Sequence, residues 1–112
     1  MERASCLIIR EKKILLVKEG DTWKLPGGDV QGDAEASAVK ATEEAIHATP
    51  VIVQLFDRLE RQVDGENIEE AIFEAVLPDG TDAESFDWCD AKDLKGKKIG
   101  SEVELVLEDL SQ

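Results

Sequence analysis

The chain of 112 residues has room for one domain, over residues 1–112, because a domain usually takes about 100 to 200 residues. Its 26 acidic residues outnumber its 13 lysines and arginines and give a formal net charge of −13. This charge excludes a nucleic-acid polymer as a partner, because binding to a phosphate backbone needs clustered basic residues. The acidity fits a need for solubility and equally a high-salt habitat.

No stretch of the sequence approaches the roughly 20 apolar residues that cross a membrane, and residues 1–6 do not begin a signal-peptide pattern. We therefore expect a cytoplasmic protein with no membrane partner. The two cysteines, Cys6 and Cys89, lie far apart, and the only histidine is His47. A thiolate zinc site needs closely spaced ligands, so both cysteines are predicted to be small core residues.

Two apolar runs open the chain, at residues 5–9 and 14–17. The charged tetrapeptide Arg10-Glu11-Lys12-Lys13 separates them, which predicts a hairpin of two largely buried strands. Residues 20–32 then hold four glycines, one proline and Trp23. This composition predicts a structured loop with a short extended piece, ordered by Trp23.

Residues 33–47 predict a central helix, because they contain neither glycine nor proline and are rich in alanine. Asp33 can cap the amides of the first turn. Pro50 disfavours helical geometry at Thr49 and so helps to end the helix. The expected apolar face is a narrow stripe suited to close packing on a sheet. Its members are Ala34, Ala38, Ala41 and Ala45, with Val39 and Ile46 beside them.

The rest of the chain predicts a second hairpin and a closing helix. Residues 51–59 and 68–76 read as strands, and Asp64-Gly65 between them is a turn signal. Residues 85–89 alternate as a short strand. Apolar residues at helical spacing in residues 101–110 predict an amphipathic helix.

This succession of elements resembles the Nudix family over most of the chain. Trp23-Lys24-Leu25-Pro26-Gly27-Gly28 resembles the entry to the family's signature loop, and residues 86–94 are similar to the aromatic strand and short helix near the family's C-terminus. The resemblance implies an α/β fold, an α/β/α sandwich around a mixed sheet, with a central helix about 33–47 and a C-terminal helix about 101–110. It also implies hydrolysis of a nucleoside diphosphate linked to another group, with Mg²⁺ or Mn²⁺ as cofactor.

Such a reaction needs carboxylates, because the metal must be held before it can neutralise the pyrophosphate and activate water. On a helix these carboxylates must recur at spacings of three or four to share one face. Counting from Gly28, the family's first glutamate falls on Ala34, its arginine-glutamate pair on residues 42–43, its final glutamate pair on residues 46–47 and its terminal glycine on Thr49. Only the glutamate at position 43 survives in this register.

Two further registers allow a shorter loop before the helix. A shift by one residue puts Asp33 at the first position and residues 41–42 and 45–46 at the two pairs, so only Asp33 survives. A third register puts Glu43-Glu44 at the final pair, but residues 39–40 then stand for arginine-glutamate. No register restores the whole metal site.

Glu43 and Glu44 are the predicted catalytic and metal-binding residues, because both lie in the C-terminal half of the helix. The alternative is a solvated helix face, since adjacent helical residues point about 100° apart. Glu70, which begins the strand after the Asp64-Gly65 turn, is the third predicted metal ligand, and an ordinary surface charge is its alternative. His47 at the helix end favours an interaction with the helix dipole over metal binding.

Trp23, Gly27 and Gly28 are the predicted substrate-binding residues. The two glycines let the backbone approach a phosphate, or they only permit positive φ angles in a tight turn. Trp23 either stacks on a nucleobase or anchors the loop in the core, and the anchoring role is favoured.

Two functions remain open from the sequence. The first is a divergent Nudix-like hydrolase of a small nucleoside diphosphate-linked substrate that depends on Mg²⁺ or Mn²⁺. The second is a catalytically inactive Nudix-fold module that binds a nucleotide or another protein, favoured by alanines at positions 34, 41 and 45 where ligands would stand. A homodimer through an exposed edge strand is left open as well.

Overall fold

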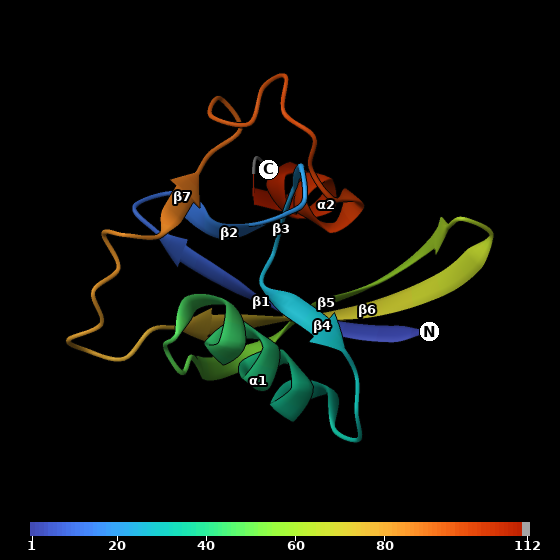
Figure 1. The fold of residues 1–112 in the computed structure, drawn as a ribbon, viewed down its shortest axis with the longest axis horizontal. Helices are drawn as coiled ribbons and strands as arrows, with labels where there is room; N and C mark the ends of the chain where they lie inside the picture. The colour runs from blue at the N-terminus through green and yellow to red at the C-terminus, as the bar shows by residue number, and fades with distance from the viewer. Residues whose placement is uncertain (111–112) are drawn as a thin grey trace.

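The computed structural model describes residues 1–110 as one mixed sheet with two helices (Figure 1). The strands are β1 (Glu2–Arg10), β2 (Lys13–Glu19), β3 (Thr22–Lys24), β4 (Gly27–Asp29), β5 (Val51–Val63), β6 (Glu66–Val76) and β7 (Asp87–Cys89). The helices are α1 (Ala34–Ile46) and α2 (Ser101–Leu110). The predicted order of strands, loop, helix, hairpin and closing helix is therefore confirmed.

The first predicted hairpin forms between β1 and β2, which pair antiparallel from Ile9 opposite Ile14. Its two turn residues, Glu11 and Lys12, both have positive φ angles, of 52° and 68°. A turn of this kind matches the right-handed twist of the strands it joins, and that match offsets the strain of two non-glycine residues at positive φ.

Strand β1 lies in the middle of the sheet and makes it mixed. The main strand order is β3-β2-β1-β6-β5, and β1 runs parallel to β6 over Glu2 to Ile8. Its other neighbours, β2 and β4, are antiparallel to it. Parallel pairing requires a long connection, and here the whole segment from β2 to β5, including α1, joins β1 to β6.

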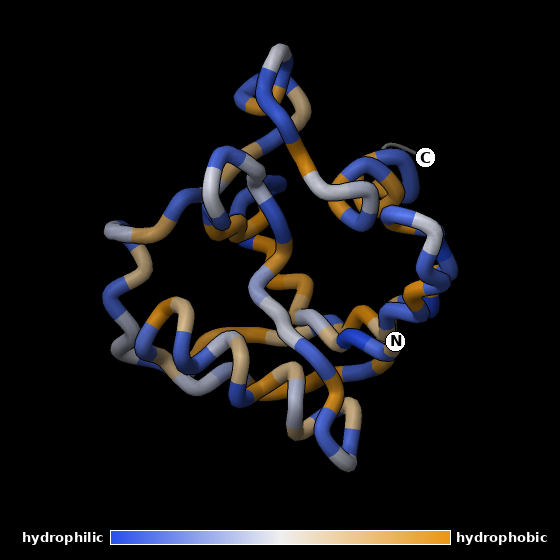
Figure 2. The backbone as a smooth tube through the Cα atoms, turned by 45° about the vertical axis from the view of Figure 1, so that its right-hand side comes forward, coloured by the Kyte–Doolittle hydropathy of each residue, from blue (hydrophilic) through white to orange (hydrophobic). Residues whose placement is uncertain are grey.

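The two faces of the sheet carry separate cores, as the alternation of side chains along β1 shows. Cys6 lies in one core with Ala38 of α1, whereas Leu7 lies in the other core with Val103 and Val106 of α2. The apolar positions of the sheet accordingly lie between the helices in Figure 2. This is the predicted α/β/α sandwich. Both cysteines are buried and free, as predicted.

Helix α1 begins and ends close to the predicted residues. The carboxylate of Asp33 accepts the Ala36 amide at 3.0 Å, so the predicted cap is confirmed. At the other end, His47 adopts a left-handed conformation with φ 58°, and its amide donates to the Glu43 carbonyl at 2.8 Å. The helix thus ends on this cap, shortly before Pro50.

The predicted apolar face of α1 is wrong in one respect. The buried residues are Ala38, Thr42 and Ile46, whereas Ala45 is exposed. Thr42 is buried where the pattern predicts an alanine, and its hydroxyl donates to the Pro26 carbonyl at 3.5 Å. A buried hydroxyl with a partner costs little, and a pattern based on apolar residues misses it.

The second hairpin is longer than predicted. Strands β5 and β6 pair antiparallel from Val51 opposite Val76 to Val63 opposite Glu66, around a turn at Asp64 and Gly65 with φ angles of 52° and 83°. The charged residues after Leu59 do not end the strand, because they pair across the hairpin and continue the ladder. The pairing shifts register twice, between Ile52 and Gln54 and between Leu55 and Asp57.

The C-terminal part returns to the sheet through β7, which pairs with β2, and ends in α2. The amides of Val103 and Glu104 both donate to the Gly100 carbonyl, which starts the helix at the predicted position. Neither helix of the described chain has the length and apolar content needed to cross a bilayer.

Candidate functional site

A cleft of about 470 Å³ lies where α1 passes β4 and the loop that joins them. Its lining residues are Gly28, Asp29, Gln31, Ala36, Ser37, Lys40, Ala41 and Glu44. The helix contributes positions three or four residues apart, which place one row of its side chains along the cleft. The strand contributes backbone at Gly28, where an added methyl group would lie 3.2 Å from Cβ of Ala41.

Ser37 holds the loop against the first turns of α1 at one side of this cleft. Its hydroxyl accepts the Gln31 amide at 2.9 Å and lies 3.4 Å from the Gln31 carbonyl, to which it can also donate. Gly32 follows with φ 82°, a conformation that glycine adopts at little cost. The cleft wall is thus ordered by the protein's own hydrogen bonds.

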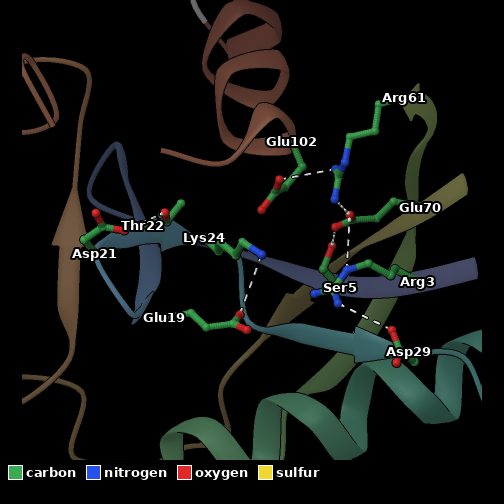
Figure 3. Close-up of polar contacts among 10 residues, drawn as sticks. All are labelled: Arg3, Ser5, Glu19, Asp21, Thr22, Lys24, Asp29, Arg61, Glu70 and Glu102. Carbon is green, nitrogen blue, oxygen red and sulfur yellow. Dashed lines mark hydrogen bonds and ion pairs between the residues drawn. The ribbon is translucent and has the colours of Figure 1, made fainter. Parts of the chain in front are cut away.

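A second polar cluster lies on the opposite face of the sheet, beneath α2 (Figure 3). Glu70 of β6 is its centre and is 1% exposed. Its Oε2 accepts the Ser5 hydroxyl at 2.7 Å, and its Oε1 lies 2.7 Å from Nη2 of Arg61 and 3.8 Å from Nε of Arg3. The carboxylate is therefore engaged by residues of β1 and β5.

Glu102, in the first turn of α2, extends this cluster. Its Oε2 lies 3.3 Å from Nη1 of Arg61, so one guanidinium faces two carboxylates. Burial and, to a smaller extent, the charge of Glu70 raise the pKa of Glu102, while its own backbone amide and Arg61 offset part of that rise. The sequence analysis missed this cluster. A signal was present, because Arg61 stands two residues after the partly buried Leu59 on β5 and so shares its face of the sheet.

No protein-family model matches the sequence, and no curated protein matches it significantly. Solved structures do match. A Nudix hydrolase from Nitrosomonas europaea has a TM-score of 0.83 at 12% identity, over 98% of this chain and 87% of that one. A MutT Nudix hydrolase from Burkholderia pseudomallei has a TM-score of 0.76 at 21% identity, over 96% and 95% of the two chains. This chain has the Nudix fold.

The likeness extends to a C. elegans Ap4A hydrolase, with a TM-score of 0.73 at 19% identity over 98% of this chain and 94% of that one. The end of α1 can be compared with the end of the family's box, which is a glycine two residues after the final glutamate pair. His47 has the left-handed conformation that such a glycine favours at a helix end. The resemblance to the box can therefore be aligned with His47 in the place of that glycine.

This match sets a fourth register of the Nudix box, between those counted from the sequence. The final pair becomes Glu44-Ala45, and the arginine-glutamate pair becomes Lys40-Ala41. Lys40, Ala41 and Glu44 all line the cleft beside Gly28, and Lys40 and Glu44 also line the neighbouring groove. Counting from Gly28 could not find this register, because the number of residues in the loop before the helix varies independently of the helix.

The structure separates the three predicted metal ligands. Glu44 lines both the cleft and a neighbouring groove, whereas Glu43 lines the groove and not the cleft, and Glu43 accepts the Thr49 hydroxyl at 2.6 Å. Glu70 lies on the far face of the sheet. It stands two residues before Ile72 on β6 and so shares a face with it, and Ile72 belongs to the core under α2. Within residues 1–110 no three histidine, cysteine, aspartate or glutamate side chains are grouped to hold a metal. The described residues therefore do not fit a divalent-metal site built by the protein alone.

Two of the three predicted substrate-binding residues, Trp23 and Gly27, contact the protein's own side chains and backbone and do not line the cleft. The ammonium groups of Lys18 and Lys97 lie 5.7 and 5.5 Å from the centroid of the Trp23 ring, which packs on the core under α2. A methyl group on Gly27 would lie 2.6 Å from the Ala4 carbonyl oxygen, so glycine allows β4 to approach β1. Of the three, Gly28 is the one that lines the cleft.

Proposed function

We propose that the chain is a Nudix-fold module that binds a nucleotide-like diphosphate in the Gly28 cleft without hydrolysing it. The observation that carries this proposal is the composition of the box in the register that His47 indicates. Ala41 and Ala45 stand where that family places glutamates, and Glu44 is the carboxylate that remains. A single box carboxylate binds a hard dication weakly, and Asp29 is the one further carboxylate in the cleft lining, so we expect a bound metal to activate water poorly.

The lining of the cleft supports a phosphate-containing ligand. Lys40 supplies an ammonium group, which pairs with phosphate as a compact charge. The backbone at Gly28 can approach a ligand closely, and Ser37 and Gln31 add hydroxyl and amide groups. The likeness to an Ap4A hydrolase adds a reason to test dinucleoside polyphosphates first.

Calorimetric titration with Ap4A and with ADP, each with and without Mg²⁺, tests the proposal. We expect binding without release of mononucleotide, and a loss of roughly tenfold in affinity in Lys40→Ala, because one charged hydrogen bond to phosphate is removed. Lys92→Ala is the matched control, since Lys92 is exposed and lies outside the cleft lining. Equal losses in both variants, or no binding at all, would contradict the proposal.

A second candidate is the slow, metal-dependent hydrolase that the sequence predicts. It is favoured by one observation: Asp29 and Glu44 both line the cleft, and Mg²⁺ is often held by one or two carboxylates together with substrate phosphates. Turnover of the same nucleotides with Mg²⁺ or Mn²⁺, abolished by Glu44→Gln and retained in Glu43→Gln, would establish this function in place of the first.

A further inference from the structure

Strand β5 leaves a long edge of the sheet open. Within residues 1–110 it pairs with β6 alone. The edge strand at the opposite end, β3, is covered, because the Trp23 amide donates to the Lys98 carbonyl and the Gly100 amide donates to the Trp23 carbonyl. Open edges present unpaired backbone groups that another strand can use.

Exposed apolar side chains gather on the N-terminal half of β5. Val51, Val53 and Leu55 are 54%, 56% and 44% exposed, and Val76, which pairs with Val51, is 50% exposed. Residues 45–56 contain no aspartate, glutamate, lysine or arginine, in a chain of which 35% is charged. This half of the edge strand therefore carries no charge of its own, although across the ladder Oε2 of Glu74 accepts the Gln54 side-chain amide at 2.7 Å.

A groove of about 590 Å³ runs between this edge and α1. Its lining residues are Asp33, Glu35, Ala36, Val39, Lys40, Glu43, Glu44 and Ile52. Four carboxylates and one lysine line it together with three apolar residues, of which Ile52 is the one that β5 contributes. The carboxylates are not grouped for a metal in the described chain. From Asp33 to Glu43 the helix rises roughly 15 Å, a length that an extended segment of about five residues spans.

We propose that the β5 edge and this groove dock an extended segment of a partner protein in which lysine or arginine alternates with apolar residues. The segment adds a strand to β5, so backbone hydrogen bonds supply affinity and alternate side chains supply specificity. Its basic side chains face the carboxylates beside α1. Its apolar side chains lie on the other face of the sheet, next to Val51 and Val76.

The surroundings of β5 limit the length of the docked segment. The carboxylate of Asp57 accepts the Arg58 amide at 2.8 Å, which satisfies that backbone group and closes the edge there. Pro50 precedes the strand at its other end. The open stretch is therefore Val51 to Phe56. The register shifts between Ile52 and Gln54 and between Leu55 and Asp57 bend the strand there, so a docked segment pairs with it over short runs of backbone.

A second copy of the chain fits this surface poorly. Each copy carries a net charge of −13. Antiparallel pairing of two β5 edges about a two-fold axis would also place both acidic grooves on the same face of the joined sheet. Repulsion between like charges at an interface opposes such an association, whereas a basic segment meets complementary charge.

The test uses the full chain and a fluorescent Lys-Val-Lys-Val-Lys-Val peptide, measured by anisotropy. We expect binding that weakens between about 50 and 300 mM NaCl, and no binding of the matched Glu-Val peptide. Glu35→Gln with Glu43→Gln should weaken binding roughly fivefold or more, because two complementary charges are removed. Asp79→Asn with Glu84→Gln changes the net charge equally outside the groove and should have little effect.

Hydrogen exchange gives a second readout that simple charge attraction does not move. We expect added protection of amides in residues 51–56 when the peptide is bound, because strand addition engages the backbone. Equal weakening in both double variants, or unchanged exchange in residues 51–56, would overturn the proposal. Concentration-dependent dimerisation with protection of the same residues would overturn it too, by assigning the edge to a second copy. None of these outcomes depends on nucleotide binding at Lys40.

Discussion

Nη2 of Arg61 and Oε1 of Glu70 lie 2.7 Å apart on the two strands of the long hairpin, with both side chains largely buried. This contact is an ion pair and not a hydrogen bond, because Oε1 of Glu70 has no hydrogen-bond partner in the described chain. Through Glu70 the pair reaches Ser5 of β1, and through Arg61 it reaches Glu102 of α2. One guanidinium thus connects the hairpin, the central strand and the closing helix.

Replacing Arg61 with methionine should be strongly destabilising. It removes the guanidinium from Glu102 and leaves Glu70 with Arg3 alone, whose Nε lies 3.8 Å from Oε1. Removal of one partner of a buried pair costs about 3 kcal/mol of unfolding free energy. Urea denaturation measures the change. The double variant Arg61→Met with Glu70→Met should recover part of the loss, because an apolar pair replaces the ionic one. A loss well under 1 kcal/mol in the single variant would show that the ion pair contributes little.

The free energy of unfolding should depend on pH through the raised pKa of Glu102. Its folded pKa is raised, chiefly by burial, so above the ordinary value of 4.5 the folded protein retains a proton that the unfolded chain has lost. The stability that this group contributes is therefore fully present below pH 4.5 and is lost as pH rises through the folded pKa. Unfolding curves from pH 4.5 to 8 should show a smaller decline in Glu102→Gln than in the unchanged protein. Parallel profiles would contradict the raised pKa.

Elements with a local cause could be predicted from the sequence. The Asp33 cap, the alanine-rich helix and the Asp64-Gly65 turn each depend on residues that are close neighbours in the chain. The cluster of Glu70, Arg61 and Glu102 could not be predicted, because its members meet only after the hairpin and α2 pack on the same face of the sheet.

The register of the candidate site was hidden for a different reason. It depends on His47, a histidine in a left-handed conformation that non-glycine residues seldom adopt, and no local pattern marks such a residue. It depends also on the length of the loop between Gly28 and Asp33, which the helix pattern does not determine. The geometry of β4 against α1 supplies what the sequence lacks.

The two glycines at the start of the cleft should respond differently to alanine. In Gly27→Ala the new methyl group would meet the Ala4 carbonyl oxygen and Cβ of Ser5, both at 2.6 Å, so β4 must move away from β1. We expect a loss of about 2 kcal/mol or more in unfolding free energy. In Gly28→Ala the nearest atom is Cβ of Ala41 at 3.2 Å, so the loss should be smaller. Equal losses in the two variants would contradict the close approach of β4 to β1 at Gly27.

The two cysteines should be inert while the protein is folded. Burial raises the pKa of the Cys6 thiol, which also donates to the Ala38 carbonyl at 3.6 Å, and burial followed by the charge of Asp93 raises the pKa of Cys89. The thiolate is the reactive species, so a raised pKa and lack of access both slow its reaction. Titration with a thiol reagent at pH 8 should detect neither cysteine in buffer and both after unfolding in denaturant. Rapid reaction of Cys89 in buffer would show that β7 separates from β2 on the time scale of the assay, since the two strands pair at Ile14 and Cys89.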